Sequence, residues 1–175
     1  MSNTNAPHGL MPLGVSLSGG PQAIEVFSKP STLNTAIFRY DPVARLADGS
    51  ISSKQADITP GSTLYSGVAL AYGAASTATD HHVLLSPDAI FEAQTDSTGL
   101  VATDMGCNAN LEYGAGSAVT KLSGWIINHT PCDGTSTSDV HLLRKFDVPT
   151  NDYGAYARLE IVFNKHRMAP GVAGV

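Results

Sequence analysis

Charged side chains are scarce in this sequence. Asp, Glu, Lys and Arg make up 14% of its 175 residues, whereas about 25% is typical of globular domains. The chain holds 17 glycines and 10 prolines, and its hydrophobic fraction of 42% is ordinary. Two interpretations of a surface with so little charge stay open. Neighbouring molecules cover part of it, or the chain is simply a β protein rich in turns.

Positive charge is the scarcer sign. The chain has 10 Lys and Arg against 15 Asp and Glu, for a net charge of −5. The basic residues are scattered, with small groupings only at residues 144–145 and 165–167. Because nucleic-acid binding requires basic residues clustered on one face, we expect no nucleic-acid partner. Long hydrophobic runs are missing as well, since none approaches the about 18 residues of a membrane span, and we expect no membrane partner.

Cysteine is represented only by Cys107 and Cys132. Neither belongs to a pair of closely spaced Cys or His residues, which a zinc site requires. Residues 1–5 carry no positive charge and no apolar core, so they do not read as a secretory signal peptide. We therefore expect a protein made in a reducing cytoplasm, where both cysteines remain unpaired thiols.

A catalytic constellation is also missing. No serine lies in a Gly-x-Ser-x-Gly elbow, and carboxylates such as Glu92 and Asp96 show no spacing that pairs them across a cleft. The densest set of metal-ligand side chains is Asp80-His81-His82. Adjacent side chains on a strand point to opposite faces, so we interpret this set as a polar loop-to-strand junction. The sequence predicts no enzyme activity, no cofactor and no metal site.

Short β-rich runs, separated by Gly, Asn, Asp or Ser, dominate what is present. Their spacing is typical of an all-β sandwich or barrel, and no stretch shows the sustained spacing of a capped helix. Asp48-Gly49 favours a tight hairpin turn, and Trp125, the only tryptophan, is expected in the core. The predicted strands cover residues 23–27, 35–40, 64–72, 83–85, 89–94, 122–127, 140–143 and 157–163. They form one core domain, residues 23–168, followed by a flexible tail, residues 169–175.

Residues 1–22 differ from this core, because they are rich in Gly and Pro and hold no charged side chain. Apolar residues nevertheless alternate with small or polar ones over residues 13–17, the period of an extended strand with one buried face. We interpret the segment as an extended arm that lies on another surface, its own domain's or a neighbour's. A neighbouring chain is the predicted docking surface, because the arm has no structure of its own. The predicted interface residues are Leu10, Met11, Leu13, Val15 and Leu17.

Short motifs follow one another in order between residues 59 and 168. A Pro-Gly turn at 60–61 precedes a Gly-Val-Ala run at 67–69, and a Phe-Glu-Ala-Gln segment follows at 91–94. An Asp-x-Gly turn lies at 104–106, a Leu-Leu strand at 142–143, an Asn-Asp turn at 151–152 and a Val-Phe-Asn-Lys-His end at 162–166. This order, over roughly two thirds of the chain, resembles the small capsid decoration (cement) proteins of tailed bacteriophages.

The resemblance implies a non-enzymatic virion protein with a β-barrel or sandwich fold. It implies binding to the major capsid protein on the outside of the shell, as a homotrimer or a dimer. Such a protein bridges several capsid subunits and stabilises the shell against internal DNA pressure, many copies acting together. The alternative is a receptor- or carbohydrate-binding β module of a phage tail or fibre. That module would show repeats and an exposed aromatic platform, whereas aromatic residues total only 7% here.

Overall fold

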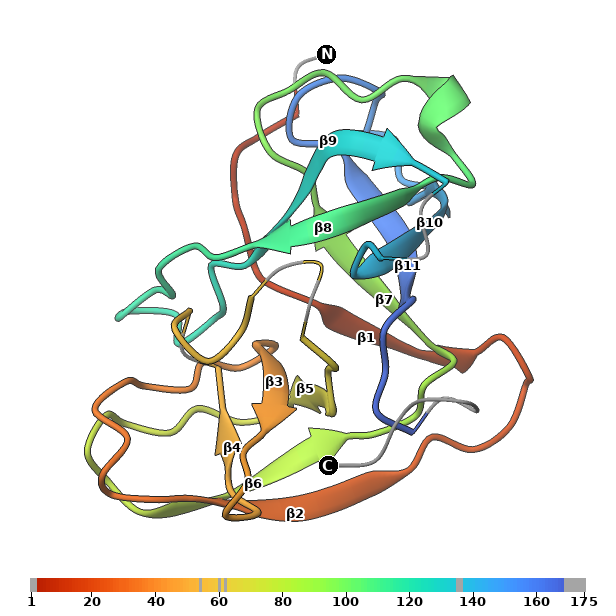
Figure 1. Cartoon of the computed structure of the whole chain (residues 1–175). Coiled ribbons are helices and arrows are strands. Elements are labelled where there is room, and N and C mark those ends of the chain that lie inside the picture. The colour runs from red at the N-terminus through yellow and green to blue at the C-terminus, as the bar shows by residue number, and fades with distance from the viewer. Residues whose placement is uncertain (1–2, 54, 60, 62, 135–136, 169–175) are drawn as a thin grey trace.

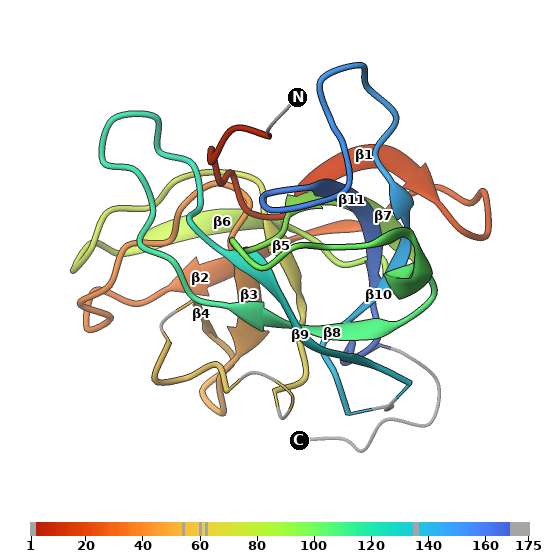
Figure 2. The ribbon, with the colours of Figure 1, turned by 90° about the horizontal axis from the view of Figure 1, so that it is seen from above.

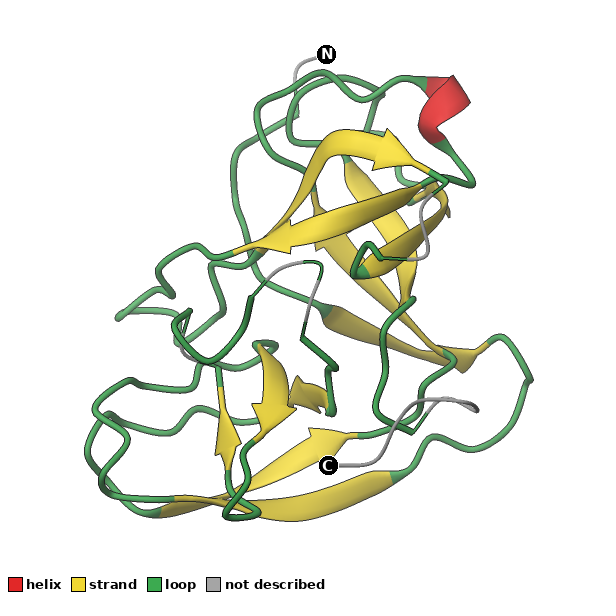
Figure 3. Cartoon of the chain, viewed as in Figure 1, coloured by secondary structure: helices red, strands yellow, loops and turns green. Residues whose placement is uncertain are grey.

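A computed structural model describes residues 3–53, 55–59, 61, 63–134 and 137–168. Their strands form two curled antiparallel sheets (Figure 1), joined mainly by loops and turns (Figure 3). The predicted all-β fold is therefore confirmed, and η1 (Ala102–Asp104) is a single 3-10 turn. The strands are β1 (Met11–Ser16), β2 (Ile24–Lys29), β3 (Pro42–Arg45), β4 (Ile51–Ser52), β5 (Gly67–Ala69), β6 (Thr79–Leu84), β7 (Ala89–Gln94), β8 (Asn108–Glu112), β9 (Ile126–Asp133), β10 (Val140–Lys145) and β11 (Arg158–Phe163).

The larger sheet has six strands in the order β1-β7-β11-β10-β8-β9. It curls until its last strand approaches β7 again. The amide of Asp96, just after β7, donates to the carbonyl of Ile127 in β9 at 2.9 Å. β7 thus pairs with β1 along residues 89–92 and meets β9 beyond its own end, which gives this sheet a half-barrel shape (Figure 2).

The smaller sheet has five strands in the order β2-β6-β5-β3-β4. β2 pairs with β6 along its whole length, from Ile24 opposite Leu84 to Lys29 opposite Thr79. The β3–β4 hairpin turns at the predicted Asp-Gly pair, where Gly49 takes a φ of 86° that favours glycine. β2 and β4 form the two edges of this sheet.

The main hydrophobic core lies between the two sheets, and a second cluster covers the other face of the smaller sheet. Neighbouring residues of β6 show the division, because Leu84 belongs to the main core and Val83 to the second cluster. Trp125 is 1% exposed and packs edge-on against Tyr113, with ring centroids 5.4 Å apart. Its predicted place in the core is confirmed.

The N-terminal segment is built into this core. Gly9 has a φ of 75°, and a Cβ there would lie 2.5 Å from the carbonyl oxygen of Tyr40, so only glycine fits. The next amide, that of Leu10, donates to the same carbonyl at 3.0 Å. The Leu10 side chain is fully buried in the main core, and β1 then pairs with β7.

These contacts revise the expected arm. Residues 3–16 dock on their own domain, whereas a neighbouring chain was the predicted surface. The division at residue 22 therefore does not separate an arm from the core, since core contacts begin near the start of the chain. Residues 1–2 and the predicted tail, residues 169–175, lie outside the described residues.

Candidate functional site

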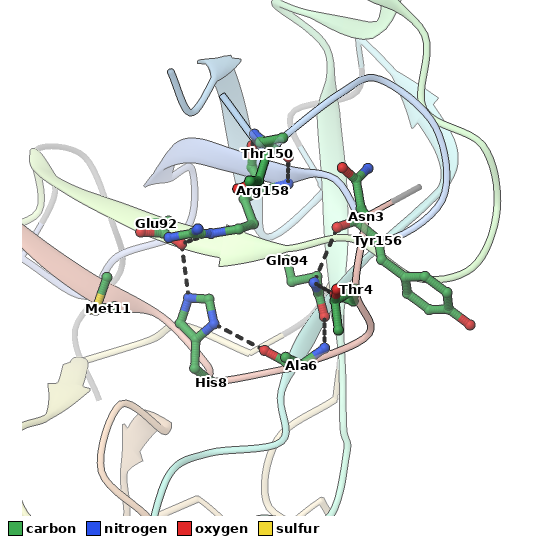
Figure 4. Close-up of a pocket in the computed structure, with 11 residues that line it drawn as sticks. Asn3, Thr4, Ala6, His8, Met11, Glu92, Gln94, Thr150, Tyr156 and Arg158 are labelled. Atoms are coloured by element: carbon green, nitrogen blue, oxygen red, sulfur yellow. Dashed lines mark hydrogen bonds and ion pairs between the residues drawn. The ribbon is translucent and has the colours of Figure 1, made fainter. Parts of the chain in front are cut away.

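The N-terminal segment crosses β7 and the loop before β11, where side-chain hydrogen bonds hold it (Figure 4). Gln94 of β7 accepts from the amide of Ala6 at 2.9 Å and donates to the carbonyl of Thr4 at 2.8 Å. Asn3 exchanges two hydrogen bonds with the backbone of Asp152, at 2.8 and 2.9 Å. Because Gln94 is 2% exposed, these bonds fix residues 3–8 against a buried part of the domain.

His8, Glu92 and Arg158 meet in a hollow beside this segment (Figure 4). The Glu92 side chain is fully buried; its Oε1 accepts from Nε of Arg158 and lies 3.3 Å from Nε2 of His8. Burial opposes ionisation of Glu92, but its hydrogen bonds and charge interactions with His8 and Arg158 prevail and lower its pKa below the ordinary value. Glu92 is therefore a buried carboxylate that ties the N-terminal segment to β11.

The hollow encloses about 360 Å³ and is lined by the N-terminal segment, β7, the start of β11 and the loop before it. Several of its polar groups make internal contacts, while Oε2 of Glu92 has no hydrogen-bond partner among the described residues. Gln94 and Asn3 form hydrogen bonds that hold the segment. Oε1 of Glu92 contacts both His8 and Arg158. Across the part of the chain that the structure describes, no three His, Cys, Asp or Glu side chains gather as a metal site would require. This geometry favours anchoring of the segment over chemistry.

Farther along, the same segment presents apolar side chains to solvent. Val15 and Leu17 are 52% and 59% exposed, and Ile24 and Val26 of β2 are 55% and 52% exposed. We name these four residues the β1–β2 surface, and they are four of the eight large hydrophobic side chains exposed among the described residues. The Gln22 side chain donates to the carbonyl of Val15 at 2.8 Å and so holds the linking turn closed.

Two open strand edges accompany the β1–β2 surface. Within the described residues β1 pairs only with β7 and β2 only with β6, so each strand ends its sheet. The linking segment runs along the right side of Figure 1 from one sheet to the other. Glu25 is the only charged residue between residues 9 and 28. Edges are usually protected by charge, but β1 carries none and β2 exposes only Glu25, so these apolar edges have the chemistry of a protein–protein contact.

The predicted interface residues divide between core and surface. Leu10 is 0% exposed in its own domain and is not available to a partner, which corrects that part of the prediction. Met11 lines the hollow, and Leu13 is half-buried. Val15 and Leu17 are exposed on the β1–β2 surface. Ile24 and Val26 were not predicted, although their spacing places them on one face of β2.

Asp80, His81 and His82 do not converge. Asp80 is exposed and accepts from the hydroxyl of Ser28 at 3.0 Å, while His82 is also exposed. His81 points to the other face and is fully buried, where burial and then the nearby charge of Lys29 lower its pKa. This alternation of faces is the one that the sequence predicts for adjacent strand residues.

Comparison with known proteins gives no relative, since no family model, no curated protein and no solved structure matches the chain. The described residues contain no helix with the length and apolar character needed to cross a bilayer.

Proposed function

We propose that this chain is a non-enzymatic capsid decoration protein of a tailed bacteriophage. It binds the outside of the major capsid shell and stabilises the shell against the pressure of packaged DNA. The β1–β2 surface carries the proposal, because exposed apolar side chains coincide there with two open strand edges. The resemblance supplies the partners: the major capsid protein, and further copies of this chain in a homotrimer or dimer. The protein is made in the host cytoplasm and resides on the virion surface.

The β1–β2 surface has enough apolar area for modest affinity. Full burial of a Val, Leu or Ile side chain contributes about 1.5–3 kcal/mol, and each of the four side chains keeps just over half of its area exposed. A partner covering all four would therefore gain about 4 kcal/mol before ordering costs. Backbone hydrogen bonds along either edge add affinity with little demand on sequence. Modest affinity per copy suffices when many copies bridge the same shell.

The motifs that carry the resemblance lie in the strands of the fold and outside the β1–β2 surface that we propose for capsid binding. The Gly-Val-Ala, Phe-Glu-Ala-Gln and Leu-Leu motifs form parts of β5, β7 and β10, all within the two sheets. The β1–β2 surface lies in residues 15–26, before the first of these motifs. The alternative, a carbohydrate-binding module, requires an exposed aromatic platform. The only tryptophan does not supply one, because Trp125 is 1% exposed.

Binding to empty shells tests the proposal. The probe is a shell assembled from the major capsid protein of the virus that encodes this chain. The double variant Leu17→Ser, Val26→Ser should bind such shells at least tenfold more weakly, since it removes about 2 kcal/mol of apolar contact. Its unfolding temperature should stay near that of the wild type, because both side chains are more than half exposed.

The matched control is the double variant Val101→Ser, Val119→Ser, whose side chains are 53% and 89% exposed away from the β1–β2 surface. It should bind shells like the wild type. Shells carrying the wild-type protein should also release DNA at a higher temperature than bare shells. The proposal fails if the wild-type chain does not bind shells, or if both double variants bind as tightly as it does.

A further inference from the structure

Cys107 and Cys132, distant in the sequence, meet where β8 begins and β9 ends. Asn108 of β8 lies opposite Asp133 of β9, so the residues that precede these two are diagonal neighbours across the strand pair. An interaction between the two thiols is among the causes that raise the pKa of Cys132, which is consistent with their closeness. Both side chains are partly buried, and both are free thiols. The spacing of the two cysteines in the sequence did not predict this contact.

The backbone on both sides of the contact is held in place. The amide of Cys107 donates to the carbonyl of Asp104 at 3.1 Å, and its carbonyl accepts from the amide of Leu142 in β10 at 2.9 Å. Cys132 lies within β9, with its Sγ 3.6 Å from the carbonyl of Asp104. Because disulfides tolerate only a narrow geometry, two thiols on neighbouring, hydrogen-bonded backbone have less movement to make before they reach it.

We propose that Cys107 and Cys132 are a redox pair that closes into a reversible disulfide joining the start of β8 to the end of β9. The two thiols lose two protons and two electrons as the sulfur–sulfur bond forms. A disulfide oxidant such as oxidised glutathione accepts the electrons and leaves as two glutathione thiols. Reducing compartments keep such pairs open, so the bond forms when the chain meets an oxidising medium.

The environment of the pair sets the order of attack. Burial raises the pKa of Cys132 to about 12, and the contact with Cys107 and the carboxylates of Asp104 and Asp133 add to the increase. Only a thiolate attacks a disulfide, so Cys107 attacks first and forms a mixed disulfide with glutathione. Cys132 then attacks the sulfur of Cys107, and its proton goes to the departing glutathione thiolate.

Oxidised glutathione, added to the folded full chain at neutral pH, tests the proposal. After an acid quench, denaturation and alkylation, mass spectrometry should find a chain without free thiols or bound glutathione, and a cross-linked peptide pair containing Cys107 and Cys132. The bond closes a loop of about 25 residues, which should raise the unfolding temperature by about 5–10 °C. Dithiothreitol should reverse both changes.

Two single variants report the order of attack. Cys132→Ser should retain glutathione on Cys107, whereas Cys107→Ser should react more slowly, because burial still raises the pKa of Cys132 in that variant. Equal rates for the two variants would overturn that order. The redox pair itself is overturned if the folded wild type keeps both thiols or carries glutathione on each cysteine. A bond that forms only after denaturation would overturn it equally.

Discussion

Replacing Leu10 with alanine tests whether the N-terminal segment belongs to the core. Leu10 is 0% exposed and packs in the main core, while Leu17, the same residue type in the same segment, is 59% exposed. The two substitutions remove the same atoms and differ chiefly in burial. Leu10→Ala should therefore destabilise the fold, and Leu17→Ala should leave its stability nearly unchanged.

The expected cost follows from how little the site can adjust. Leu→Ala changes in cores cost about 2–5 kcal/mol, and the loss is largest where the surroundings cannot collapse into the cavity. The backbone at Leu10 is fixed by its hydrogen bond to Tyr40 and by the close approach of Gly9 to that residue. We expect a loss of about 3 kcal/mol, or about 6–12 °C in the unfolding temperature of a domain of this size. Leu17→Ala should stay within about 0.5 kcal/mol of the wild type.

Urea unfolding, followed by the fluorescence of the buried Trp125, measures both variants. The dependence of the unfolding free energy on urea should be the same in all three proteins, so that midpoints compare directly. If Leu10→Ala loses no more stability than Leu17→Ala, the segment is a loosely attached terminus and the inferred anchoring is wrong. By the same reasoning, deleting residues 2–20 should unfold the protein, because it removes both Leu10 and β1.

Two buried titratable groups predict opposite responses to pH. Burial lowers the pKa of His166 to about 4 from 6.5, so its contribution to stability, about 3 kcal/mol, is present above pH 6.5 and is lost as the pH falls through 4. In His166→Asn, the free energy of unfolding measured with urea should not show this decrease at low pH. If the variant has the same pH dependence as the wild type, His166 is not its cause. Burial raises the pKa of Asp41 from 3.8 to about 6, despite hydrogen bonds from Ser123, Phe38 and Ser53 that oppose the increase. The contribution of Asp41 to the stability of the fold is therefore present below pH 3.8 and is lost as the pH rises through 6. Asp41→Asn should therefore gain up to about 3 kcal/mol on the wild type between pH 4 and pH 7, and a constant difference between the two proteins would refute this.

The strands that the sequence predicts best are those at the centre of the larger sheet. Residues 89–94, 140–143 and 157–163 match β7, β10 and β11 closely, because β-rich, apolar residues repeat there over a packed core. Residues 35–40 were predicted as a strand but form only single bridges, such as that of Ile37 with Gly73. Tyr40 takes a positive φ of 73° that interrupts the extended chain. β8 escaped prediction because only Ala109 and Leu111 mark its buried face, and pairing with β9 and β10 determines its conformation.

The candidate surface was predictable only where local contrast was strong. Val15 and Leu17 are conspicuous because they alternate within a segment rich in Gly and Pro. Ile24 and Val26 lie in a run that also contains the buried Phe27, so both faces of that strand look interior. Which face stays exposed depends on β2 being the edge of its sheet, a tertiary property. The contacts among His8, Glu92 and Arg158 likewise join distant parts of the chain, so the local sequence pattern does not predict them.

Two parts of the N-terminal segment have different roles: one anchors the segment to its own domain, and the other is the proposed docking surface. Residues 3–10 are held by hydrogen bonds to Gln94 and by the buried side chain of Leu10, whereas residues 15–26 present the β1–β2 surface. Because β1 is already ordered on β7, little conformational entropy remains to be lost when a partner binds, and more of the contact free energy stabilises the complex. A force applied to the bound surface would be transmitted through β1 to β7, because these strands are paired. β7 also carries Glu92 and Gln94. Changes at Leu10 should therefore alter stability, while changes at Leu17 should alter binding.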